Sequence, residues 1–127
     1  QAGTYKLPEA QLDRFLLKLL IEVPTRDAEL AVLRRHASGF DPRELNGLEA
    51  VVSADDIRAA RRAAASVTVS DDVLAYVVDL ARATRESPSV QLGVSPRGST
   101  ALLAAAKAWA WLGGYPAITP DHVQFFF

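Results

Sequence analysis

The stretch that decides the fold is "SPRGSTALLAAAKAWAWLGG", residues 95–114. Ser95 is a preferred helix N-cap, and Pro96 fits the first helical position, where a backbone N–H is not needed. Alanine, the strongest helix former, dominates the middle of the stretch. Gly113 and Gly114 then provide the usual termination signal. The stretch therefore predicts one long helix.

Arg97 is unusual in the first turn of this helix, because the N-terminal end of a helix already carries about half a positive charge. One interpretation is an exposed arginine that is tolerated there at a small cost. The other is an anion bound between the guanidinium and the helix N-terminus. Gly98 favours the second, because glycine costs a helix about 1 kcal/mol relative to alanine and lets a ligand approach the backbone. Ser95, Arg97 and Gly98 are therefore candidate phosphate-binding residues.

Most of the remaining chain also has helical signals. Helices are predicted over 25–39, 53–67 and 70–87, and a short last helix begins after Thr119. Each of them follows a serine or threonine that can act as an N-cap. In the helix over 70–87, five apolar residues recur at helical spacing and predict a buried stripe: Val73, Leu74, Val77, Val78 and Leu80.

The first 24 residues have a different character. "LPEAQLDRF" (7–15) predicts a short helix, and the apolar run "FLLKLLIEV" (15–23) predicts a strand buried on both faces of a parallel sheet. No second strand is expected for this run to pair with, so we expect it to be disordered, to pack on the predicted helices, or to pair with another copy of the chain. The run is the main expected source of self-association. Arg14 ends the short helix, where either the helix dipole favours a cation or an arginine finger projects towards a neighbouring subunit's phosphates.

Composition limits the function classes. The chain has 127 residues, a net charge of −1 and no cysteine, which excludes disulfides and thiolate chemistry and gives no general attraction for nucleic acid. Its two histidines are far apart, so no metal site is expected. No run approaches the ~18 apolar residues of a membrane span and no signal peptide is present, so a cytoplasmic protein is expected. A phosphate-binding G-x-x-x-x-G-K-[ST] motif is absent, so the chain alone is not expected to be catalytic.

Taken in order, "LPEAQLDRF", "VVSADDI", "GVSPRGSTALLAAAKAWAWL" and "ITPDHV" resemble the C-terminal part of the MoxR-type AAA+ ATPases. The resemblance implies a mainly α fold. Residues 25–127 would form the helical lid subdomain, and residues 1–24 would be the last helix and strand of an incomplete α/β nucleotide-binding core. The terminal "VQFFF" departs from the family pattern.

The resemblance also implies roles for the two arginines. Arg14 matches the arginine finger, which acts in trans on the ATP of the adjacent subunit, and Arg97 matches the sensor 2 arginine, which reaches the γ-phosphate. ATP and Mg²⁺ would be held mainly by Walker motifs elsewhere in the parent protein. The implied partners are the neighbouring subunits of a hexameric ring and a von Willebrand factor A-domain protein. The implied work is chaperone-like assembly or activation of partner complexes.

A second hypothesis is a stand-alone helical interaction or DNA-binding module without nucleotide chemistry. Serine, arginine and threonine cluster at the start of the helix that follows Ser95, as they do in recognition helices. The balanced charge and the lack of a basic helix face argue against this alternative.

Overall fold

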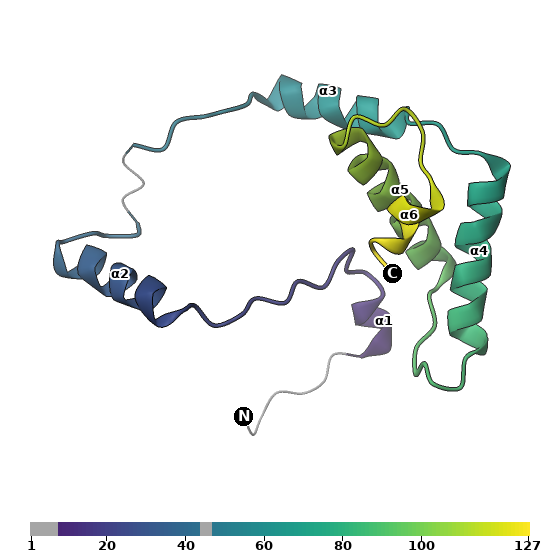
Figure 1. Ribbon diagram of the computed structural model, residues 1–127, viewed down its shortest axis with the longest axis horizontal. Helices are drawn as coiled ribbons and strands as arrows, with labels where there is room; N and C mark the ends of the chain where they lie inside the picture. Colours follow the sequence, from purple (N-terminus) through teal and green to yellow (C-terminus); the bar gives the residue numbers. More distant parts are fainter. Residues whose placement is uncertain (1–7, 44–46) are drawn as a thin grey trace. The chain divides into compact units, whose positions relative to one another are not determined.

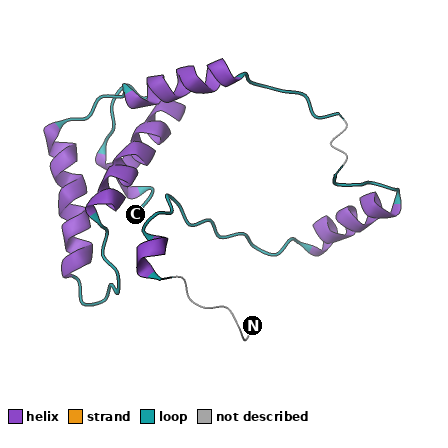
Figure 2. Cartoon of the chain, turned by 180° about the vertical axis from the view of Figure 1, so that it is seen from behind, coloured by secondary structure: helices purple, strands orange, loops and turns teal. Residues whose placement is uncertain are grey.

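The structure is a computed structural model that describes residues 8–43 and 47–127. Its helices are α1 Glu9–Leu12, α2 Arg26–Ala37, α3 Ala54–Ala65, α4 Asp71–Glu86, α5 Pro96–Leu112 and α6 Pro120–Gln124. Within the described ranges no strand forms, and the only β pairing is an isolated parallel bridge between Thr68 and Ala117 (Figure 2). The predicted mainly α fold is confirmed.

Helices α2, α4 and α5 begin directly after the capping residues predicted from the sequence. The side chains of Thr25 and Ser70 each accept a hydrogen bond from the backbone N–H three residues later, at 3.3 Å. Ser95 does the same for Gly98 at 3.0 Å. Gly114 has a φ of 77°, a left-handed conformation that ends α5 at almost no cost for glycine.

The chain divides into two compact units, residues 18–53 and residues 1–17 with 54–127. In the larger unit, α5 packs against α3, α4 and α6 (Figure 1). The core of this unit consists of small and β-branched residues: Val67, Val73, Val77, Ala106, Ala110, Ile118 and Val123. Ala106 and Ala110 are fully buried on α5, so their small side chains let the neighbouring elements approach the helix closely.

The buried face of α4 is narrower than predicted. Val73, Val77 and Ala81 are buried along one row of every fourth residue. Leu74 and Val78 remain 39% and 50% exposed. Leu80, also in the predicted stripe, is half-buried and packs against the core together with Tyr76. The prediction is therefore confirmed for Val73, Val77 and Leu80 and wrong for Leu74 and Val78.

The C-terminal aromatic run packs on α5. The ring of Phe125 stacks on Trp109 at a centroid distance of 4.3 Å, and Phe126 meets the same indole edge-on at 6.2 Å. The side-chain amide of Gln124 donates to the hydroxyl of Tyr76 at 2.6 Å, which ties α6 to α4. Trp109 and Trp111 are still 42% and 37% exposed, so neither indole fills the core.

The strand predicted over residues 15–23 does not form in this structure. A strand needs a partner for its backbone N–H and C=O groups, and no other strand exists among the described residues. Leu19, Leu20 and Ile21 are accordingly 78–92% exposed. The preceding helix is confirmed but shorter than predicted, at Glu9–Leu12.

Residues 18–53 form a small unit around α2, which has no buried residues. In this unit an ion pair joins Asp41 to Arg43 at 2.7 Å. Hydrogen bonds from the Arg43 side chain and backbone lower the pKa of Asp41, and the same pairing raises the pKa of Arg43. Across the described part of the chain, no helix is both long and apolar enough to cross a bilayer.

Candidate functional site at the N-terminus of α5

Arg97 occupies the second position of α5 and is exposed. Within residues 8–43 and 47–127, no hydrogen bond or ion pair engages its guanidinium, and the first turn of α5 contains no acidic residue. A planar guanidinium in this position can bind a carboxylate or phosphate through two parallel hydrogen bonds. The structure thus leaves Arg97 available for an anion.

The acid missing from the first turn is supplied from a distant part of the chain. Ser95 donates a hydrogen bond from its hydroxyl to Oδ1 of Asp13 at 2.6 Å, across 82 positions of sequence. The same hydroxyl accepts from the N–H of Gly98. A carboxylate at this end of the helix is favoured by the helix dipole. Asp13 is a site residue that sequence reasoning missed, because no local pattern connects it to Ser95.

Gly98 has a packing reason to be a glycine. A Cβ at this position would lie 2.9 Å from Cγ1 of Val94, closer than real Cβ contacts. Close approach of Val94 therefore explains the glycine without a ligand. The prediction that Ser95 and Gly98 also contact a nucleotide remains a prediction.

The loop before α5 is fixed to the end of α4. The N–H of Val94 donates to Oγ1 of Thr84 at 2.9 Å, and that hydroxyl donates to the carbonyl of Ala81 at 2.7 Å. The backbone of Gly93 lies so close to Arg85 that a Cβ at position 93 would be 2.6 Å from the Cα of Arg85. The start of α5 is therefore held against a buried part of α4.

Arg14 lies in the turn after α1 and is exposed. No hydrogen bond or ion pair in the described part of the chain involves its side chain. Its two neighbours are engaged: Asp13 bonds to Ser95, and Phe15 lines a pocket beside α5. The structure therefore brings the segment that carries Arg14 to the N-terminal end of the helix that carries Arg97.

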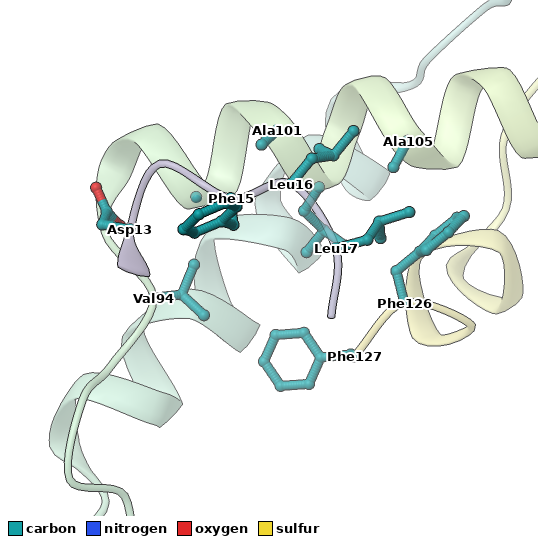
Figure 3. Close-up of a pocket in the computed structure, with 11 residues that line it drawn as sticks. Asp13, Phe15, Leu16, Leu17, Val94, Ala101, Ala105, Phe126 and Phe127 are labelled. Carbon is teal, nitrogen blue, oxygen red and sulfur yellow. The ribbon is translucent and has the colours of Figure 1, made fainter. Parts of the chain in front are cut away.

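The pocket beside α5 has a volume of about 180 Å³ and is mainly apolar. Phe15, Leu16 and Leu17 lie along α5, near Ala101 and Ala105, and Phe126 and Phe127 approach from the C-terminal end of the chain (Figure 3). Asp13 lies at the far end of this segment, beside the start of α5 (Figure 3). The segment of residues 13–17 therefore lies beside α5, with its polar contact at the start of the helix and its apolar side chains lining the pocket.

His122 has a local role at the start of α6. Its Nδ1 accepts a hydrogen bond from the N–H of Thr119 at 3.0 Å, and its ring meets Tyr115 edge-on at a centroid distance of 4.9 Å. His122 therefore helps to start α6. Within the described residues, no group of three or more His, Cys, Asp or Glu side chains is arranged to hold a metal ion.

Comparison with known proteins shows which family this chain resembles. Residues 82–127 match the AAA lid domain. The chain is 32% identical over 130 residues to the chaperone MoxR1 of Mycobacterium tuberculosis and 33% identical over 142 residues to the protein MoxR of Paracoccus denitrificans. Each alignment covers 95% of this chain. Over nearly its whole length, the chain is therefore similar to MoxR-type AAA+ proteins.

Two further proteins are similar to this chain. The chain is 43% identical over 123 residues to the uncharacterized protein YeaC of Bacillus subtilis. The crystal structure of a "putative ATPase" from Cytophaga hutchinsonii matches 98% of this chain with a TM-score of 0.77 and 29% identity. The chain described here spans 38%, 33% and 40% of the lengths of YeaC, MoxR1 and the Paracoccus MoxR, and 40% of the solved chain.

Proposed function

We propose that this chain belongs to an AAA+ ATPase and contributes two arginines to ATP hydrolysis. The observation that carries the proposal is the exposed guanidinium of Arg97 in the first turn of α5, within the residues that match an AAA lid domain. The similarity to a protein named as a chaperone, over 95% of the chain, supports a chaperone-like role for the whole protein.

Arg97 would act as the sensor 2 arginine and bind the γ-phosphate, with Ser95 and Gly98 beside it. Arg14 would act as an arginine finger on the ATP of the adjacent subunit. Both guanidiniums are exposed and have no partner in the described ranges, which fits a role towards phosphate oxygens. ATP, held with Mg²⁺ by Walker motifs elsewhere in the protein, would supply the phosphoanhydride bond that is cleaved. The arginines stabilise charge that develops on the phosphoryl oxygens.

The proposed division of the chain follows from these roles. Residues 1–24 would complete an α/β nucleotide-binding core, and residues 25–127 would form the lid that moves relative to that core as nucleotide binds and leaves. The protein would act in the cytoplasm as a hexameric ring. It would assemble or activate partner complexes, with a von Willebrand factor A-domain protein among its partners.

Substitution of each arginine in the full-length protein tests the proposal. We expect Arg14→Ala and Arg97→Ala each to lower the ATPase turnover number at least about a hundredfold, because each removes charge stabilisation from the phosphoryl group. Arg62→Ala is the matched control, since Arg62 is another exposed arginine within a helix, on α3. Unchanged far-UV circular dichroism would show that the variants remain folded.

Wild-type turnover by the Arg97→Ala protein at saturating ATP would refute the sensor 2 role. Mixing the Arg14→Ala and Arg97→Ala proteins tests whether the two arginines serve different ATP sites, in which case partial turnover returns. Binding of duplex DNA that is lost in Arg97→Ala, with ATPase activity unaffected, would favour the DNA-binding hypothesis instead.

A further inference from the structure

A threonine hydroxyl attaches the start of α5 to the end of α4. Oγ1 of Thr84 donates to the carbonyl of Ala81 at 2.7 Å and accepts from the N–H of Val94 at 2.9 Å, ten positions further along the chain. Because the donor is used within α4, the lone pairs of the oxygen are available to the loop. Ala81 is fully buried and Thr84 is half-buried. The last residues before α5 are therefore held on a buried part of α4.

A close contact at the preceding residue acts in the same direction. A Cβ on Gly93 would lie 2.6 Å from the Cα and 2.8 Å from the backbone N of Arg85. The backbone of a helix cannot move aside as the end of a flexible side chain can, so any larger residue at position 93 would push the loop away from α4. Gly93 does not have a positive φ, so this close approach, and not its backbone conformation, requires the glycine.

Arg97 follows this attachment within one helical turn. The hydroxyl of Ser95 accepts from the N–H of Gly98 at 3.0 Å, and the carbonyl of Ser95 accepts from the N–H of Ser99 at 2.9 Å. These bonds close the first turn of α5, so the backbone of Arg97 takes its position from Val94 and Ser95. Its guanidinium is exposed and has no partner in the described ranges, so its place depends on where this backbone is held. Residues 84–99 all lie within the range that matches the AAA lid domain, and the attachment therefore does not involve residues 1–24.

We propose that Thr84 is a positioning residue for Arg97. Its hydroxyl fixes the first turn of α5 on α4, so that the guanidinium of Arg97 is already in place when the lid closes on the γ-phosphate. Gly93 supports this role because it lets the loop lie against α4. Thr84 itself does not contact ATP. The inference deepens the proposed ATPase function and rests on the sensor 2 role of Arg97.

The first test is turnover in the full-length protein. Thr84→Val keeps the shape of the side chain and removes the hydroxyl. We expect it to lower the ATPase turnover number about tenfold, with little change in the KM for ATP, because a misplaced arginine mainly affects the transition state. Thr84→Ser should retain most of the turnover, since serine keeps the hydroxyl. Gly93→Ala should slow turnover by a similar factor, because its Cβ displaces the loop from α4.

Ser66→Ala and Gly113→Ala are the matched controls. The hydroxyl of Ser66 donates at 2.7 Å to the carbonyl of Ala63, three residues earlier, which is the local bond that Thr84 also makes. A Cβ on Gly113 would lie 2.9 Å from the ring of Tyr115, at the opposite end of α5 from Arg97. Both controls should keep turnover within about twofold of the wild type. If they slow turnover as much as Thr84→Val and Gly93→Ala do, the losses reflect general destabilisation and the proposal is wrong.

Combination with Arg97→Ala separates positioning from stability. Thr84→Val should slow the wild-type protein about tenfold but should not slow the Arg97→Ala protein further, because no guanidinium is left to misplace. A residue that only stabilises the fold would reduce turnover by the same factor in both backgrounds. A further tenfold loss in the Arg97→Ala background would therefore overturn the proposal.

Hydrogen exchange provides a readout that does not depend on ATP chemistry. In the full-length protein, Thr84→Val should speed exchange of the Val94 amide, because this N–H loses its acceptor, whereas Thr84→Ser and Ser66→Ala should leave it close to the wild-type rate. Unchanged exchange of this amide in Thr84→Val means that the hydroxyl does not hold the loop, and the positioning proposal fails even if Arg97→Ala abolishes turnover. Faster exchange combined with wild-type turnover of Arg97→Ala would show that the sensor 2 proposal is wrong, and the positioning role falls with it.

Discussion

A single carboxylate changes the interpretation of Arg97. From sequence, an arginine in the first turn of a helix was either an exposed residue tolerated at a small cost or one side of an anion site. The structure places the carboxylate of Asp13 at this helix end through Ser95, so the helix dipole is already balanced in part by the chain itself. The guanidinium of Arg97 has no such partner in the described ranges. The case for a phosphate therefore depends on the side chain of Arg97 and no longer on an unbalanced helix end.

Asp41 offers a prediction that concerns one residue. Its pKa should lie below the ordinary value of 3.8, because Arg43 donates side-chain and backbone hydrogen bonds to the charged carboxylate. The ion pair therefore stabilises the local turn above the ordinary pKa, and this contribution is lost as the pH falls through the lowered pKa. Carboxyl carbon NMR should measure the shift in the wild type, and Arg43→Ala should return Asp41 to its ordinary pKa. An unshifted Asp41 in the wild type would contradict this ion pair.

At the scale of helices, local signals predicted where elements begin, and long-range contacts decided what they pack against. Thr25, Ser70 and Ser95 marked helix starts correctly because an N-cap depends on residues only three positions away. The strand over 15–23 was not predictable in the same way, because it requires a partner strand. The bond from Ser95 to Asp13 was equally hidden, since 82 positions separate the two residues. The site could be predicted only as two separate arginines.

The docking of α6 leads to a prediction about stability. Val123 is fully buried, whereas Val78 on α4 is 50% exposed. Val123→Ala should lower the free energy of unfolding of the chain by about 2 kcal/mol, because it removes packed methyl groups and leaves a cavity. Val78→Ala makes the same chemical change on a half-exposed surface and should cost less than about 0.5 kcal/mol. Urea denaturation measures both values, and equal losses would mean that α6 is not docked in solution.

At the scale of the whole molecule, the apolar run over residues 15–23 has different surroundings in this chain and in a longer protein that contains it. In this chain, Ile21 is 92% exposed, which is costly for so apolar a segment. The chain spans 33% to 40% of the lengths of its curated MoxR relatives and of a matching solved structure, so each of those proteins has a large additional part. A parallel sheet in such a part would give the run the partner strands that it lacks here.

Replacing Ile21 by lysine tests whether this side chain is exposed in the 127-residue chain and buried in the full-length protein. Ile21→Lys should change the stability of the 127-residue chain by less than about 0.5 kcal/mol and reduce its self-association in analytical ultracentrifugation, because the side chain is exposed there. In the full-length protein the same substitution should destabilise the nucleotide-binding core by several kcal/mol, because it buries a charge in a sheet. Val51→Lys is the matched control, since Val51 is also 92% exposed but lies outside the run, and it should be tolerated in both proteins. If the full-length protein tolerates Ile21→Lys equally well, the run is not a core strand and residues 1–24 do not complete an α/β domain.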